Sequence, residues 1–291
     1  AFNSNKNKGT DVLKGVNPAS GMVLYYDLPS LSKETELTLT IKDAQGNMVN
    51  TFSSKANKNY ISYEGNPPKN PTLSKNEGLN RFVWNMRYPL LPGVPKVYIE
   101  GGYSGHRAIP GPYQLTLTYD QKRFENPAII QPNPLYDLSE AQYRTYHEFM
   151  TATAATYREM TNMTNRLNEI NTKLKSLLLK MDPTNHNELI AMGNTLSEDL
   201  TLWDGIMVQR LSKAYDDVEN FENGFTAHYL NLISESNSPI PKITQGSESR
   251  KVELNAEWAI HKQHAERLLK GQVQVFNAAC QAQSVGVLFV E

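Results

Sequence analysis

The sequence predicts an α+β multidomain protein in which an N-terminal antiparallel β-sandwich precedes a long-helix antiparallel bundle. Two observations indicate this. Short alternating apolar runs separated by turn residues fill the N-terminal part, and apolar residues recur every three or four positions in the C-terminal part. The length of 291 residues also suits two ordinary domains. We expect the sandwich at residues 1–125, a linker at 126–138 and the helical bundle at 139–291.

The strands of the expected sandwich can be followed in order. MVLYYDLP reads as a strand, and TELTLTIKD then places Leu37, Leu39 and Ile41 on one face. The Gly-bearing residues 44–47 predict a hairpin turn into the return strand MVNTFSS. A polar, broken loop is expected from Lys55 to Glu77, and PYQLTLTYD ends the set. Several short strands over about 100 residues are typical of an Ig-like sandwich.

The strand GLNRFVWNMRYP carries a tryptophan, an asparagine and two arginines, so it raises the question of a binding face. In an extended strand Phe82, Trp84 and Met86 share one face, and Arg81 and Arg87 lie on the other. The first face is typical of a core, which favours Trp84 as a packing residue over a sugar-stacking platform. The arginine face is where we expect the bundle or another domain to rest.

A long amphipathic helix is predicted after the linker. Ser139 with Gln142 forms a capping-box start, and Asp137 with Glu140 is a competing pair. Apolar residues then recur with helical spacing until Asp182-Pro183 ends the pattern. About 42 residues at 1.5 Å each give a helix of roughly 63 Å, which needs antiparallel partners.

Two further helices are the predicted partners, at residues 185–211 and 249–283, which gives a three-helix bundle. Between them we expect a loop at YDDVENFENG, a short extra helix near 225–234 and a breaker run, SESNSPIPKITQG. The apolar end VGVLFVE is expected to pack as an extended tail on the bundle or the sandwich.

Composition excludes several classes of function. The formal net charge of −1 gives no basic field for nucleic acid or anionic lipid. No run of apolar residues approaches the length of a membrane span. Cys280 is the single cysteine and cannot form an internal disulfide, so we expect a small buried apolar residue there.

The sequence predicts no catalytic residue, no metal site and no cofactor. His261 and His264 have a spacing that suits two metal ligands, but no third ligand accompanies them. The acidic stretch that starts at Asp216 lacks the pattern of a calcium loop, which favours a solvated loop. There is no serine elbow or phosphate-binding loop, and the carboxylates of the β half form no evident pair.

The best candidate for binding is the segment Val97–Tyr113, here called the tyrosine loop. Its aromatic and hydrogen-bonding members are Tyr98, Tyr103, His106, Arg107 and Tyr113. Such residues suit a sugar face or a protein partner equally. The favoured interpretation is a Gly-rich connection whose tyrosines pack down on the sandwich edge.

Several motifs carry a family resemblance. NPASGMVLYYDL, LTLTIKDAQGNMVNTFSS, GLNRFVWNMRYP and PGPYQLTLTYD are followed by LWDGIMVQ, DDVENFENG, PIPKITQGSESRKVELNAEW and QVFNAAC. In this order they resemble the C-terminal region of bacterial sortilin-like β-propeller proteins. Those proteins carry BNR (Asp-box) repeats and are described as glycosyl hydrolase-related. The resemblance runs from about Asn17 to Cys280.

The resemblance implies a C-terminal fragment, because the Asp-box pattern S-x-D-x-G-x-x-W of the propeller does not occur in this sequence. It implies a periplasmic or extracellular bacterial protein whose partner is its own N-terminal propeller. The chain starts with the polar run AFNSNKNKGT, so either a signal peptide has been removed or a longer protein continues upstream. No catalytic residue is carried over.

Three functions follow as hypotheses. The first is a non-catalytic scaffolding or protein-interaction module, and the second is a carbohydrate-binding accessory module that uses the tyrosine loop. The third, least favoured, is an enzyme with paired carboxylates between the sandwich and the bundle. Solvent-facing, coplanar tyrosines would favour the second hypothesis, whereas rings packed inward would favour the first.

Overall fold

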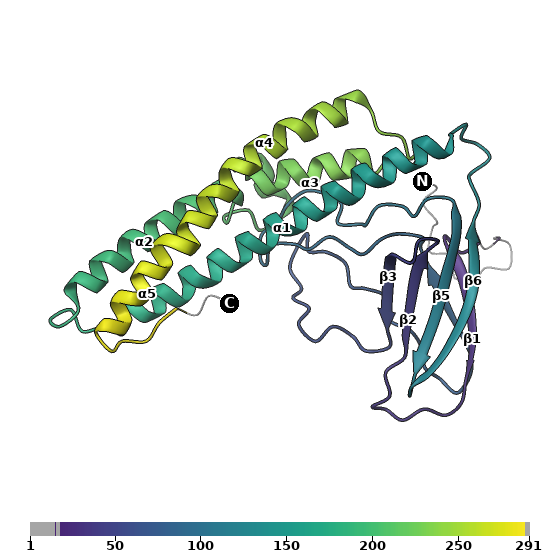
Figure 1. Ribbon diagram of the computed structural model, residues 1–291, viewed down its shortest axis with the longest axis horizontal. Coiled ribbons are helices and arrows are strands. Elements are labelled where there is room, and N and C mark those ends of the chain that lie inside the picture. The colour runs from purple at the N-terminus through teal and green to yellow at the C-terminus, as the bar shows by residue number, and fades with distance from the viewer. Residues whose placement is uncertain (1–14, 16–17, 289–291) are drawn as a thin grey trace.

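The computed structural model describes residue 15 and residues 18–288, and it has an α+β architecture with antiparallel sheets beside long helices (Figure 1). The first helix begins above the strands, and the helices extend away from them. Residues 1–14, 16 and 17 of the expected sandwich lie outside the described residues, as do residues 289–291 of the expected tail.

Six strands form two antiparallel sheets within the described residues. They are β1 (Met22–Leu28), β2 (Thr38–Asp43), β3 (Met48–Ser53), β4 (Gly78–Trp84), β5 (Gly111–Tyr119) and β6 (Lys122–Ile130). One sheet has the order β3-β2-β5-β6, and the other pairs β1 with β4. The predicted alternation of the second strand is confirmed, because Leu37, Leu39 and Ile41 are buried in a core that both sheets share.

Strand β6 was not predicted, and it shortens the expected linker at 126–138. Residues 126–130 continue β6, which pairs with β5 as far as Ile130 opposite Gly111. The turn before it places Asp120 and Gln121 at positive φ, 44° and 63°, as a two-residue hairpin turn requires. No glycine marks this turn. Pro127 fits because β6 is an edge strand, where a missing N–H can face away from the sheet.

The core assignment of strand β4 is confirmed for Phe82 and Trp84, which are 5% and 0% exposed. Trp84 also donates its indole N–H to the backbone oxygen of Arg87 at 3.1 Å. The strand ends at Trp84 because Met86 takes a positive φ of 54°, so the alternation does not continue. Met86 nevertheless packs against the sheet core, and Arg81 is exposed.

The helices confirm most of the predicted pattern. They are α1 (Glu140–Leu178), α2 (Asn187–Met207), α3 (Phe225–Ser236), α4 (Gln245–Arg267) and α5 (Val273–Ala282), with a 3-10 turn η1 (Tyr215–Glu219) and a π-helical turn η2 (Leu268–Gln272). Ser139 caps α1 through a capping box with Gln142. Helix α4 begins before the expected Ser249, because Thr244 accepts the Ser247 N–H as an N-cap.

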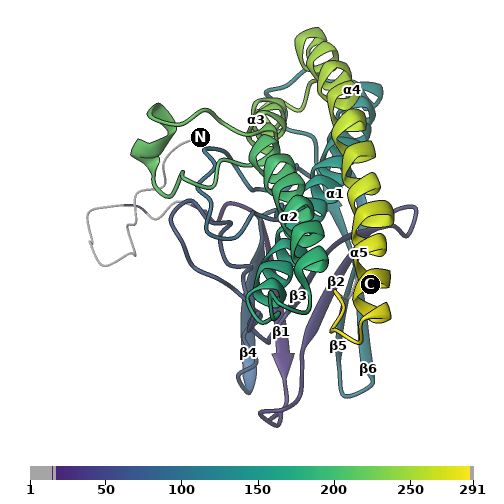
Figure 2. The same ribbon diagram turned by 90° about the vertical axis from the view of Figure 1, so that its left-hand side faces the viewer.

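The helices pack side by side around α1. Helix α2 and the α4–α5 pair lie alongside α1 in both views (Figure 1, Figure 2). The tail packs on the helical side, where Leu288 is 4% exposed and its backbone bonds to the Asn277 side chain. No helix in the described part of the chain combines the length and apolarity that a membrane crossing needs.

The connection between β4 and β5 belongs to the helical core, although the sequence places it in the β half. Its buried apolar residues are Leu91, Val94, Val97, Ile99 and Tyr103. They share one cluster with Tyr146, Tyr157 and other α1 residues, whereas Ala108 and Tyr113 return to the sheet core. The two cores are therefore joined by a chain segment that contributes to both.

Candidate functional site

The tyrosine loop lies between the sheets and the helices. Tyr103, His106 and Tyr113 are between 3% and 5% exposed, whereas Tyr98 and Arg107 are half-buried. Three of the five predicted ligand-binding side chains are thus packed against the protein itself. Four of the five residues lie in the connection between β4 and β5 and Tyr113 lies on β5, and the structure does not present them together on an open surface.

Tyr98 and Tyr113 of this loop have partners within the protein, whereas the buried Tyr103 hydroxyl has no hydrogen-bond partner among the described residues. Tyr113 donates its hydroxyl to the Ile109 oxygen at 2.6 Å, and burial raises its pKa. The Tyr98 ring lies edge-on to Tyr215, with centroids 6.5 Å apart. It also covers Gly65, where a Cβ would lie 2.5 Å from the Tyr98 ring, so a larger residue would displace the ring.

His106 contacts both Tyr88 and, on α1, His147. Its ring stacks on Tyr88 at 4.1 Å between centroids, and its Nε2 lies 3.3 Å from Nδ1 of His147. Burial lowers the pKa of His106 to about 3, with further lowering by His147 and the positive charge of Arg87. Burial also lowers the pKa of His147, opposed by Asp43 and Glu148. Both rings are therefore neutral at neutral pH and can share one hydrogen bond.

Asn237, at the end of α3, connects three segments of the chain beside these histidines. Arg87 donates through Nη1 to the Gly105 oxygen at 2.8 Å and to Oδ1 of Asn237 at 3.2 Å. Tyr146 donates its hydroxyl to the same Oδ1 at 3.0 Å. The Arg107 N–H in turn donates to the Tyr146 hydroxyl at 3.2 Å. Arg87 lies beyond the end of β4 and contacts the helical side through Asn237, whereas Arg81 on the strand itself is exposed, so the expectation that the helices rest on the arginine face of the strand is not tested.

We call this set the junction, and it consists of Arg87, Tyr88, Gly105, His106, Tyr146, His147 and Asn237. Its groups are buried or half-buried and most of its polar atoms bond within the protein. This arrangement holds the sheets and the helices together, and it leaves little polar surface for a ligand.

The residues considered for metal binding do not assemble into a site. Among the residues that the structure describes, no group of three or more His, Cys, Asp or Glu side chains is placed to hold a metal ion. His261 Nε2 lies 3.6 Å from Glu257, and its ring packs on Phe225. Asp217 uses Oδ2 to accept the Lys213 and Ala214 N–H groups, at 2.6 and 3.0 Å, so it caps η1.

An open cleft that the sequence did not predict has Leu90 in its lining, two residues beyond Tyr88 of the junction. We call it the loop cleft; it is lined by parts of residues 51–63, 67–72 and 90–95 together with Glu36 and Arg158, and its volume is about 900 Å³. One wall is the loop that follows β3, and Arg158 enters from α1. This volume lies near the upper end for ligand pockets.

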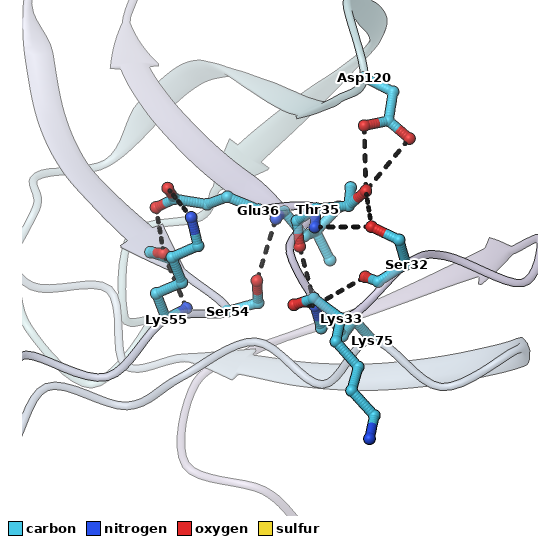
Figure 3. Close-up of polar contacts among 10 residues, drawn as sticks. Ser32, Lys33, Thr35, Glu36, Ser54, Lys55, Lys75 and Asp120 are labelled. Carbon is cyan, nitrogen blue, oxygen red and sulfur yellow. Dashed lines mark hydrogen bonds and ion pairs between the residues drawn. The ribbon is translucent and has the colours of Figure 1, made fainter.

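Both ends of that loop are tied to the turn before β2 (Figure 3). At the first end, Lys55 pairs with Glu36 at 3.4 Å. At the other end, Lys75 donates to the backbone oxygens of Ser32, Lys33 and Thr35 at 3.1, 2.6 and 2.8 Å. All three N–H groups of the ammonium are thereby used. These contacts fix where the loop leaves the sheet and where it returns.

The cleft carries positive charge that the protein does not neutralise locally. Glu36 is the only acidic residue in its lining and is already paired with Lys55. Lys69 lies over the Tyr60 ring, 5.1 Å from its centroid. Arg158 donates through Nη2 to the Pro89 and Leu90 oxygens at 2.9 and 2.8 Å. Within the described residues, neither Lys69 nor Arg158 has a carboxylate partner.

A signal in the sequence could have pointed to this cleft. The loop from Lys55 to Glu77 is longer than most connections in compact domains, and loops of that length without secondary structure are usually functional or disordered. No sequence pattern predicted that Arg158 would line the cleft, because it resembles the other charged residues of the long helix α1.

Comparisons with protein-family models, with curated proteins and with solved structures gave no match for this chain.

Proposed function

We propose that this chain is a non-catalytic scaffolding module, in which an Ig-like sandwich and an antiparallel three-helix bundle act as one rigid unit. In this proposal the unit packs against a preceding β-propeller of an exported bacterial BNR-repeat protein, or it docks another protein. The propeller, the export and the periplasmic or extracellular location rest on the sequence resemblance alone.

The observation that carries the proposal is the packing of the β4–β5 connection into the helical core. Leu91, Val97 and Tyr103 come from the β half of the sequence but are buried among the helices. A flexible linker would leave such residues exposed, whereas a scaffold needs the parts held in one orientation. The Arg87–Asn237 bond adds a polar constraint between β4's continuation and α3.

A carbohydrate-binding module remains the second candidate for the tyrosine loop. It is supported by Tyr98 and Arg107, which are half-buried and so partly accessible. Tyr103 and Tyr113 do not support it, because buried rings cannot stack on a sugar. The scaffolding proposal is therefore the stronger one.

The rigidity of the unit can be tested by measuring a distance between two spin labels on the full chain. Cysteines at Asn126 and Lys180 carry the labels, because both positions are exposed, one on β6 and one beyond the end of α1. A narrow distance distribution is expected, and it should broaden in an Arg87→Ala, Asn237→Ala double variant. A broad distance distribution in the labelled protein that keeps Arg87 and Asn237 would refute the scaffold.

The carbohydrate alternative is tested separately by screening the folded chain against a broad glycan panel, with calorimetric titration of any hit. Saturable binding that is lost in Tyr98→Ala but kept in Tyr25→Ala would establish it. Tyr25 is a matched control, because it is 63% exposed on β1 and lies outside the tyrosine loop.

A further inference from the structure

We infer that the loop cleft is a binding site for an acidic, extended peptide segment, with Arg158 and Lys69 as the residues that recognise its carboxylates. This inference names the docking surface of the proposed scaffolding module and therefore rests on that proposal.

The charge of the cleft selects an anionic ligand. The Glu36–Lys55 pair is neutral as a unit, so Lys69 and Arg158 leave two positive charges without a carboxylate partner. Arg158 is half-buried, and burial lowers its pKa, which reflects the cost of holding this charge away from water. A carboxylate in the cleft would offset that cost.

Arg158 is held in place before any ligand arrives. Its Nη2 donates to two adjacent backbone oxygens, Pro89 and Leu90, while Nε and Nη1 donate to no residue that the structure describes. A guanidinium fixed at one nitrogen keeps its remaining N–H groups in a fork, which matches the two oxygens of a carboxylate. Fixing the side chain in advance also reduces the entropy lost on binding.

The remaining lining suits a peptide chain. Its walls are apolar at Tyr60, Pro67 and Pro92, and exposed amides at Asn57 and Asn70 stand at the rim. Apolar walls can accept side chains, and the amides can donate to and accept from a peptide backbone. The volume of about 900 Å³ accommodates a segment of several residues.

Two observations favour side-chain recognition of a peptide over the alternatives. A saccharide needs an open aromatic face, but the Tyr60 ring is half-buried with Lys69 lying over it. Addition of a strand to the edge of β3 is also disfavoured. The Ser53 oxygen already accepts the Leu73 N–H at 3.0 Å, and the Thr51 N–H donates to the Asn50 side chain at 2.8 Å.

The test uses the full chain and an array of fluorescein-labelled decapeptides. Each peptide has two glutamates separated by one to four residues in an Ala, Pro and Leu background, and each has a matched glutamine version. At least one glutamate peptide is expected to bind tenfold or more tightly than its glutamine version, with an affinity that falls as salt rises. If no glutamate peptide exceeds its glutamine version, the inference is overturned.

Substitutions locate the binding. Arg158→Gln is expected to weaken the best peptide tenfold or more, and Lys69→Gln, in an exposed loop, should weaken it several-fold. Arg144→Gln is the matched control, since Arg144 is exposed on the same helix and outside the cleft. If the two cleft variants bind the peptide as tightly as the Arg144→Gln control does, the assignment of the peptide site to the loop cleft is overturned. Thermal unfolding shows whether Arg158→Gln is folded. If it is not, Lys69→Gln still tests the assignment.

A parallel titration with a uronate-containing oligosaccharide tests the remaining explanation, which is that the cleft binds an acidic glycan and not a peptide. Binding of the saccharide that depends on Arg158, together with failure of every peptide, would replace the peptide by a glycan ligand. Failure of both ligands with a narrow spin-label distance would reject only the cleft inference. A broad spin-label distance would reject the scaffold itself, whatever the peptides do.

Discussion

The junction and the loop cleft each contain an arginine that donates to backbone oxygens. Arg87 is half-buried between the sheets and the helices, where the Gly105 backbone oxygen and the Asn237 side-chain oxygen accept its hydrogen bonds. Arg158 makes similar bonds to Pro89 and Leu90, but it does so at the wall of an open cleft. Both arginines are half-buried, but Arg87 bridges two segments far apart in the sequence, whereas Arg158 donates to two adjacent backbone oxygens. The bridging contact makes Arg87 structural, and the open cleft leaves Arg158 available to a ligand.

The largest expected effect is at Trp84, which supports the junction from the sheet side. Trp84→Ala should lower the free energy of unfolding by about 3–5 kcal/mol, as truncation of large buried aromatics does. It also removes the indole that holds the Arg87 oxygen. Chemical denaturation followed by circular dichroism measures the loss. A loss below about 1 kcal/mol would contradict the core assignment.

The next effect is a dependence of junction stability on pH. The pKa of His106 is about 3 in the folded chain, below its ordinary value of 6.5, so the unfolded chain binds the proton more tightly. Stability from this group is complete above pH 6.5 and is lost as pH falls toward 3. The slope should be about 1.4 kcal/mol per pH unit for one proton.

Denaturation between pH 7 and 4 measures this slope, and His106→Asn should make it shallower by the contribution of one proton. His147 contributes in the same direction, because its pKa is also lowered. Carboxylates with lowered pKa values add to the slope at the acid end, so the difference between the two proteins is the informative quantity. An unchanged slope would show that His106 is accessible to protons in the folded state.

Arg87→Gln should cost about 2 kcal/mol of unfolding free energy, because hydrogen bonds from a charged donor to two separate chain segments are lost. The Asn237 and Gly105 oxygens would each lose a donor in a half-buried place. Urea denaturation at pH 7 measures the effect. A cost near zero would mean that water replaces the Arg87 donor and that the bridging contact does not matter.

The smallest expected effect is that of Arg158→Gln on stability, below about 1 kcal/mol. Leu90 lines the open cleft and Pro89 is exposed, so water can replace the lost donor at both oxygens. The same denaturation experiment gives a direct comparison with Arg87→Gln. If Arg158→Gln costs as much as Arg87→Gln, the distinction between a bridging arginine and an arginine at a cleft wall fails.

Much of the fold followed from local patterns. Alternation at Leu37, Leu39 and Ile41 identified a strand with one buried face, and the capping box of Ser139 with Gln142 set the start of α1. Such features depend on neighbours within a few residues, so a sequence displays them directly. Strand β6 was missed because its turn has no glycine and Pro127 resembles a linker signal, although an edge strand tolerates it.

The sequence by itself determined the α+β composition, the main strand and helix positions and the buried role of Trp84. Only the tertiary structure decided that Leu91 and Val97 belong to the helical core, that Arg87 meets Asn237, and that Arg158 opens into a cleft. The physical reason is the sequence separation of the interacting residues. Periodicity and caps act between residues close in the chain, whereas enclosure depends on segments far apart in sequence that meet only after folding.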